Sequence, residues 1–190
     1  MTHVVDTWTE TCLIEITKKD DSPVQFAAIT ETVDIDQGDK DIEQIANLKG
    51  GRILKYVPQE ITTITFEGYP LDVDSAGGTG VSQMFQGYTW DTTEPMITKS
   101  SITRDKFQVA ILWTNDTAAT TASGTTSTTT DAYRWWATNC RMVSCKPSFT
   151  DGVLKFTFAF KVAPFDRTGT AQINEESGDQ TAVGTIAAYS

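Results

Sequence analysis

The chain has 190 residues, of which 39% are hydrophobic and 10% aromatic, so it suits one globular domain with a substantial core. Its formal net charge of -10 argues against a protein that grips nucleic acid, because duplex binding depends on Lys and Arg neutralising phosphates. The three cysteines, Cys12, Cys140 and Cys145, are too few for a disulfide framework and odd in number. We expect them to be reduced.

The beginning of the chain, Met1 to Asp6, has no basic stretch followed by an apolar one, so no secretory signal is expected. No apolar run is long enough to span a membrane. We therefore expect a protein that is made and kept soluble in a cytoplasm, with no membrane among its partners.

Apolar and polar residues alternate with a period of two in several stretches, which is typical of strands with one buried face. The clearest stretch is Val153 to Val162, and others are 11–17, 24–32, 61–69 and 106–113. They predict a mostly β fold, an antiparallel β-sandwich, and disfavour alternating βαβ units. The candidate core residues are Ile14, Ile64, Phe66, Phe107, Val109, Ile111, Leu154, Phe156, Phe158 and Phe160.

Between Asp39 and Leu48 the apolar spacing changes to that of a helix, with Ile42, Ile45 and Ala46 three and four residues apart. Asp39 suits an N-cap, and Gly50-Gly51 suits a stop. One short helix is therefore predicted here.

Stretches rich in small polar residues and glycine predict long loops at about 70–82 and 114–130, and a weaker helical turn is predicted at 82–86. From about Pro164 onward, hydrophobic residues are too few for a core element, which predicts a C-terminal arm. Long loops in a compact domain are functional, lie against a partner or are disordered. We therefore expect residues 1–190 to form a single domain whose loops and arm contact other subunits. The candidate contact residues are Asp72, Asp74, Trp136, Phe165, Asp166 and Arg167.

The sequence contains few residue patterns that suit catalysis. His3 is the only histidine and lies at the start of the chain, so neither a Ser-His-Asp nor a Cys-His arrangement is expected. A pair of carboxylates meeting in space, as in glycosidases, is not excluded by sequence. With no nucleophile, metal or phosphate motif evident, we expect no enzyme, no cofactor and no metal site.

Three local patterns have weak functional interpretations. Asp72 to Gln83 is similar to a calcium loop, but Gln83 stands where the bidentate Glu belongs, so an acidic turn is favoured. The spacing of Cys140 and Cys145 does not suit zinc, and both are expected to be buried small hydrophobes. Trp135 and Trp136 point to opposite faces of a strand, so we expect one in the core and one covered by a loop or a neighbouring subunit.

Several segments resemble the tail tube proteins of long-tailed bacterial and archaeal viruses, the siphovirus-like major tail proteins. They are Asp39 to Arg52, the following Ile53 to Glu60, and the strand Ile61 to Pro70. Later, Leu154 to Asp166 is similar to the final core strand of that family and the turn after it.

The resemblance implies a structural virion protein that assembles with copies of itself into hexameric rings, stacked into a tube through which genome DNA is delivered. Implied partners are the tape measure protein, the tail terminator and the tail-tip proteins, with DNA only as transiting cargo. The implied location is the virion tail, after assembly in the host cytoplasm. An acidic bore would let DNA pass without adhering.

Two other interpretations stay open at this point. One is the inner tube of a contractile tail or of a secretion-like system, which has the same shape and adds a sheath partner. The other is a β-sandwich binding or adhesin module, against which the missing export signal argues.

Overall fold

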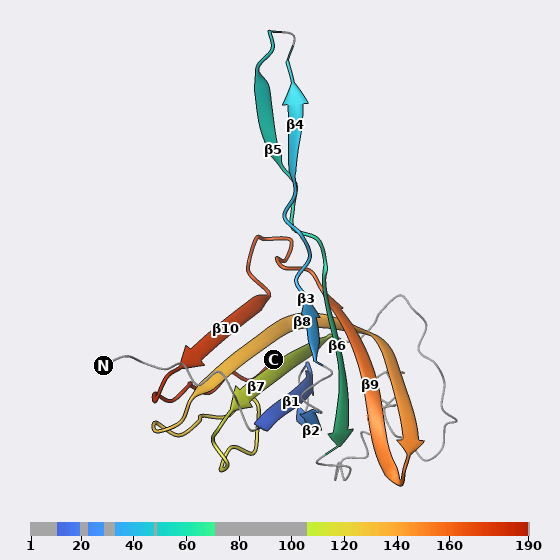
Figure 1. The fold of residues 1–190 in the computed structure, drawn as a ribbon, viewed down its shortest axis with the longest axis vertical. Coiled ribbons are helices and arrows are strands. Elements are labelled where there is room, and N and C mark those ends of the chain that lie inside the picture. The colour runs from blue at the N-terminus through green and yellow to red at the C-terminus, as the bar shows by residue number, and fades with distance from the viewer. Residues whose placement is uncertain (1–10, 20–22, 29–32, 48, 71–105, 190) are drawn as a thin grey trace.

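The computed structural model describes residues 11–19, 23–28, 33–47, 49–70 and 106–189, and within these ranges it contains ten strands and no helix (Figure 1). The predicted turn at 82–86 and nearly all of the predicted loop at 70–82 lie outside the described residues. The strands are β1 (Thr11–Lys18), β2 (Pro23–Ala28), β3 (Asp34–Asp36), β4 (Ile42–Ala46), β5 (Arg52–Tyr56), β6 (Thr62–Pro70), β7 (Phe107–Thr114), β8 (Ala132–Thr150), β9 (Val153–Val162) and β10 (Ile173–Gly178).

Eight of these strands form one curled antiparallel sheet in the order β10-β8-β7-β1-β2-β6-β3, and β9 pairs with both β6 and β8. Because β9 bridges these two strands, the pairings β8-β7-β1-β2-β6-β9 close on themselves. Register shifts between Phe107 and Val109 and between Met142 and Ser144 interrupt the ladders of β8. Such bulges bend a strand and raise its twist, which helps the 19-residue β8 to serve both halves of the curl. The mostly β prediction is confirmed.

The main hydrophobic cluster fills the inside of the curl, where β6 and β9 face β1 and β7. Phe66 and Phe158 are a cross-strand pair whose ring centroids lie 5.0 Å apart. Phe156 is half-buried against the cluster, whereas Leu154, predicted as a core residue, is 38% exposed because the β8–β9 hairpin extends past the core. The other candidate core residues are at most 2% exposed: Ile14, Ile64, Phe66, Phe107, Val109, Ile111, Phe158 and Phe160.

A second, smaller cluster lies on the outer face of β1, β7 and β8. Leu13 and Leu112 from two of these strands pack there against Ala122 of the loop after β7 and Val183 near the C-terminus. These three strands are therefore buried on both faces over much of their length, and residues of β1 and β7 are buried almost without interruption.

The segment after Pro164 was predicted to be an arm, and the structure corrects this. It returns to the sheet as β10, which pairs along β8 from Ile173↔Ala137 to Gly178↔Ala132. The following residues then cross the outer face, where Val183 is fully buried. Few hydrophobic residues are needed because the segment is held mainly by backbone pairing and one apolar anchor.

The predicted helix at 39–48 is also wrong, because Ile42–Ala46 is strand β4 of a separate two-stranded sheet with β5. Gly50-Gly51 forms the hairpin turn and not a helix stop, with Gly50 at φ +77. Apolar spacing indicates a helix only when one face of it is buried, and here every residue of both strands is exposed. The β-branched Ile42 and Ile45 favour the extended form.

Replacing Phe158 with Ala should lower the free energy of unfolding by about 3–5 kcal/mol, because the ring is fully buried among other phenylalanines. Phe149→Ala is the matched control, since that ring is 73% exposed, and should cost less than about 0.5 kcal/mol. Urea denaturation of dilute protein measures both. Similar losses for the two variants would contradict the position of the core.

Candidate functional site

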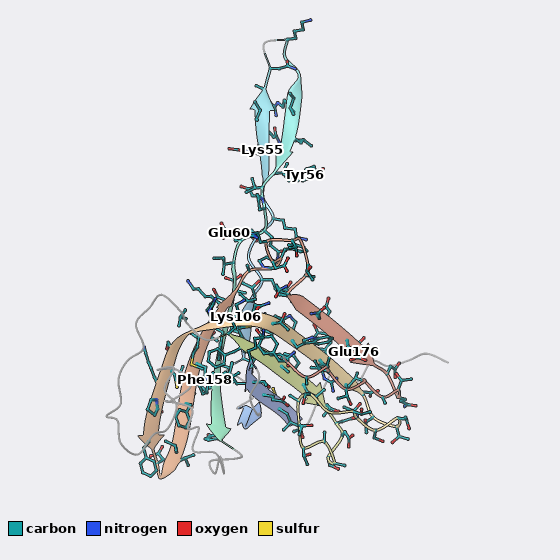
Figure 2. All side chains as sticks on the ribbon, turned by 180° about the vertical axis from the view of Figure 1, so that it is seen from behind. Lys55, Tyr56, Glu60, Lys106, Phe158 and Glu176 are labelled. Carbon is teal, nitrogen blue, oxygen red and sulfur yellow. The ribbon has the colours of Figure 1, made fainter. Side chains whose placement is uncertain are left out.

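The interior of the domain gives the β4–β5 hairpin no structural role. It projects along the long axis of the molecule, away from the curled sheet (Figures 1 and 2). All five residues of each strand are exposed. A two-stranded hairpin alone in water is marginally stable at best, so this one needs a surface to pack against.

Both faces of the hairpin carry apolar side chains. The register pairs Ile42 with Tyr56 and Ile45 with Ile53, and directly paired residues share a face while successive pairs alternate. The first face therefore holds Ile42, Tyr56 and Leu54, and the second face holds Ile45 and Ile53. Their exposed fractions run from 48% for Ile42 to 76% for Tyr56. Such a contiguous exposed apolar surface is typical of an interaction site.

Polar contacts define the hairpin's shape. In the turn, Asn47 Oδ1 accepts hydrogen bonds from the backbone N–H groups of Lys49 at 3.0 Å and Gly51 at 2.8 Å. On the second face Lys55 Nζ lies 3.2 Å from Glu43 Oε2, and both side chains are largely exposed. Exposed ion pairs contribute little to stability, so these contacts set the register without replacing a core.

The base of the hairpin is tied to the sheet by a short neck. The backbone N–H of Val57 donates to Asp41 O at 3.1 Å, and Gln59 Nε2 donates to Gln37 O at 2.7 Å. At Gly38, with φ +68, a Cβ atom would lie 2.9 Å from the Cβ of Glu60, so the two chains approach too closely there for a larger residue. The neck therefore holds the hairpin in one direction.

A second exposed apolar surface lies at the far end of the β8–β9 hairpin, here termed the β8–β9 end and defined by Pro147, Phe149 and Leu154. Phe149 pairs with Leu154, and both continue the core-facing side of these strands beyond the core. Phe149 is 73% exposed. In Figure 1, drawn with the longest axis vertical, the turn after β8 lies at the opposite end of the molecule from the tip of β4–β5.

The loop at 114–130 packs on its own sheet, and its contact with other subunits stays a prediction. The buried Asp116 carboxylate accepts hydrogen bonds from the backbone of Ala118 at 2.9 Å and Ser127 at 2.7 Å. The backbone N–H of Ser123 donates to Glu15 Oε2 at 3.1 Å. Hydrogen bonds to buried carboxylates therefore hold this loop on the sheet, in place of large apolar side chains.

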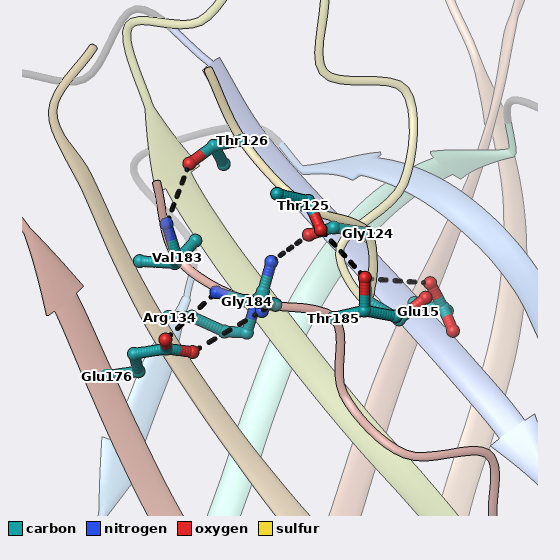
Figure 3. A network of polar contacts seen from close by, with 10 residues as sticks. Glu15, Gly124, Thr125, Thr126, Arg134, Glu176, Val183, Gly184 and Thr185 are labelled. Carbon is teal, nitrogen blue, oxygen red and sulfur yellow. Dashed lines mark hydrogen bonds and ion pairs between the residues drawn. The ribbon is translucent and has the colours of Figure 1, made fainter. Parts of the chain in front are cut away.

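Arg134 connects this loop to the C-terminal segment (Figure 3). Its side chain is fully buried, and its guanidinium donates to the carbonyl oxygens of Gly124 in the loop and Gly184 near the C-terminus. It also lies 3.6 Å from Glu176 of β10. Burial lowers the pKa of Arg134, while the carboxylates of Glu176 and Glu15 raise it. The group is a structural clamp, because all of these partners belong to its own domain.

The remaining predicted contact residues are scattered. Asp72 and Asp74 lie outside the described residues. Trp135 is 1% exposed in the main core, and Trp136 packs half-buried against the outer cluster, so the pair occupies opposite faces. Phe165 is 52% exposed and, with the exposed Asp166 and Arg167, occupies a turn before β10.

The β4–β5 hairpin was not among the predicted contact sites. The signal for it in the sequence was the turn-forming Asn47 and Gly50-Gly51 between two short segments that hold Ile42, Ile45 and Ile53, a pattern typical of a hairpin.

The described residues offer no evident chemistry. No group of three or more His, Cys, Asp or Glu side chains is arranged to hold a metal ion within the described ranges. Burial raises the pKa of the Cys12 and Cys140 thiols to about 12, so both are unreactive at neutral pH. Within the described residues, no helix is long and apolar enough to cross a membrane.

No family model matches the chain, and comparison with curated proteins finds no match. Solved structures of similar fold include a chain of the PVC sheath–tube complex, an extracellular contractile injection system in its extended state. Its identity is 13%, the match covers 86% of this chain and 88% of that chain, and the TM-score is 0.49.

Two further structures are the 6-fold symmetrised baseplate of the anti-feeding prophage, at 11% identity, 97% and 98% coverage and TM-score 0.46, and an Hcp protein. The Hcp match has 6% identity, covers 88% of this chain and 98% of that chain, and has a TM-score of 0.39. Likeness at this level carries no functional argument, so the function must follow from this chain's own surfaces.

Replacing Arg134 with Met should lower the free energy of unfolding by about 1.5–3 kcal/mol for each charge-assisted hydrogen bond that is lost, because the loop at 114–130 and the C-terminal segment are no longer tied to β8. Lys55→Met is the control, since it breaks only an exposed ion pair and should cost at most about 1 kcal/mol. Urea denaturation gives both values. Limited proteolysis should additionally show faster cleavage within 114–130 in the Arg134 variant, and unchanged cleavage would contradict the clamp.

Proposed function

We propose that this protein is a structural subunit that assembles with copies of itself, and that the β4–β5 hairpin is its principal contact. The observation that carries the proposal is a hairpin whose strand residues are all exposed and whose two faces both present apolar side chains. Such a hairpin gains its stability only when a neighbour covers it.

Further features support assembly into a tube. The hairpin and the β8–β9 end lie at opposite ends of the long axis, which suits stacking in one direction (Figure 1). Among the described strands, β10 is hydrogen-bonded to β8 alone, and strand edges of this kind invite pairing with another copy. Closing copies into a ring covers such edges, so stacked rings would satisfy both kinds of surface.

The finer proposal is a tail tube of stacked, hexameric rings that delivers genome DNA. The net charge of -10 supports a conduit over a DNA-binding protein, because an acidic wall repels the phosphate backbone. The tape measure, tail terminator and tail-tip proteins would then be its other partners, and the virion tail its location. The same self-contacts would serve the inner tube of a contractile or secretion-like system, which differs by its sheath.

The proposal is tested by replacing Ile45 and Ile53 together with Thr. Thr keeps the β-branched shape that strands favour but removes apolar surface that a partner would bury. Sedimentation velocity and negative-stain electron microscopy of concentrated wild-type protein should show rings or tubes of constant bore. In the variant the association should weaken about tenfold or more, since each buried aliphatic side chain contributes about 1.5–3 kcal/mol.

The control is Glu43→Gln with Lys55→Gln, which alters the charged pair on the same face of the hairpin and should leave assembly nearly intact. Circular dichroism should show that both variants keep the fold of the wild type. Wild-type protein that stays monomeric at every salt and protein concentration would contradict the proposal, as would a Thr variant that assembles like the wild type.

A further inference from the structure

The geometry points to a specific receptor for the hairpin: we propose that the β8–β9 end of one copy receives the β4–β5 hairpin of the next copy. This inference rests on the proposed function and adds the partner surface. The occupant is a second copy of this chain, inserted tip first along the shared long axis.

The positions of the two surfaces favour a contact between them. The tip of β4–β5 and the turn between β8 and β9 lie at opposite ends of the molecule (Figure 1). A contact between two different patches is heterologous, and when it does not close by rotation it repeats without limit. Joining these two ends therefore propagates a stack, whereas joining hairpin to hairpin would stop at a pair of molecules.

The apolar character of the β8–β9 end also suits the hairpin. The inner side of β8–β9 continues from the buried Phe158 through the half-buried Phe156 to the exposed Leu154, so apolar surface runs from the core to solvent without interruption. Phe149 lies directly opposite Leu154 in the ladder and is 73% exposed. An incoming face bearing Ile45 and Ile53 would extend the core outward across the boundary between two copies.

The charges at the two ends are of opposite sign. The hairpin tip carries two exposed cations, Lys49 and Arg52, on either side of Gly50-Gly51. The turn that ends the β8–β9 hairpin carries the exposed Asp151. Lys155 pairs with Ser148 in the ladder, so its side chain emerges on the opposite side from Phe149, where it lies 6.0 Å from the centre of the Tyr69 ring. The receiving side is therefore apolar and ends in one carboxylate, Asp151, which can pair with a cation at the hairpin tip.

The experiment mixes two defective chains. The donor-defective chain carries Ile45→Thr and Ile53→Thr, and the acceptor-defective chain carries Phe149→Thr and Leu154→Thr. Each chain alone should lose stacking, because one lacks a competent hairpin and the other a competent receptor. Mixed in equal amounts, the intact hairpin of one meets the intact receptor of the other, so the sedimenting mass should about double and grow no further.

Val153→Thr is the matched control, since Val153 pairs with Thr150 and lies on the other side of the strands from Phe149. It should assemble like the wild type. If the Phe149→Thr, Leu154→Thr chain also assembles like the wild type while the hairpin variant does not, the receptor is elsewhere. That result overturns this inference and leaves the proposed function standing, whereas wild-type protein that never assembles overturns both.

The inference also fails if the mixture behaves as the sum of its two components. Unfolding by urea distinguishes a lost contact from a misfolded chain. Because Phe149 and Leu154 are exposed, their replacement should leave the unfolding midpoint of the dilute chain almost unchanged.

Cysteine substitution at Lys49 and at Asp151 gives an independent readout. A disulfide-linked ladder of masses under oxidising conditions supports the head-to-tail contact, and unlinked monomers in an assembled sample contradict it.

Discussion

The structure depends on one strand having two partners. By pairing with β6 on one edge and β8 on the other, β9 closes the ladder and creates an inside in which Phe66, Phe158 and Phe160 exclude water. The outer faces of β1 and β7 hold Leu13, Ala110 and Leu112 beside polar residues that are also buried, so these faces need a cover. The loop at 114–130 and the C-terminal segment supply that cover. Closure of the sheet therefore determines which residues are buried inside it and which outer faces the loop and the C-terminal segment must cover.

The cover is built mostly from polar contacts, and Arg134 is its centre. A fully buried guanidinium is costly unless its donors are paired. The carbonyl oxygens of Gly124 and Gly184 and the carboxylate of Glu176 pair its terminal nitrogens, while Nε has no hydrogen-bond partner among the described residues. Most of the large apolar side chains that are exposed within the described residues lie in the β4–β5 hairpin and at the β8–β9 end. A molecule with such surfaces at its two ends is suited to form a stack.

The sequence indicated some of these features well and others poorly, for physical reasons. Alternation in Phe156-Thr157-Phe158-Ala159-Phe160 predicts a half-buried strand because burial imposes the period, and the structure has β9 there. At 39–48 no burial imposes a period, so the helical spacing of Ile42, Ile45 and Ala46 carried no information. Arg134 shows no local sign of its role, since its partners lie 10, 42 and 50 residues away along the chain. The apolar character of both ends of the molecule was visible in sequence, but their separation in space was not.

The central claim is that the hairpin is ordered by a neighbouring copy, and amide hydrogen exchange tests it most directly. Exchange of residues 42–46 and 52–56 should be fast in dilute protein, because an uncovered two-stranded hairpin opens readily. In concentrated, assembled protein the same amides should become strongly protected, while those of β1 and β7 stay slow in both samples. A hairpin that exchanges at the same rate in monomer and assembly would contradict the account.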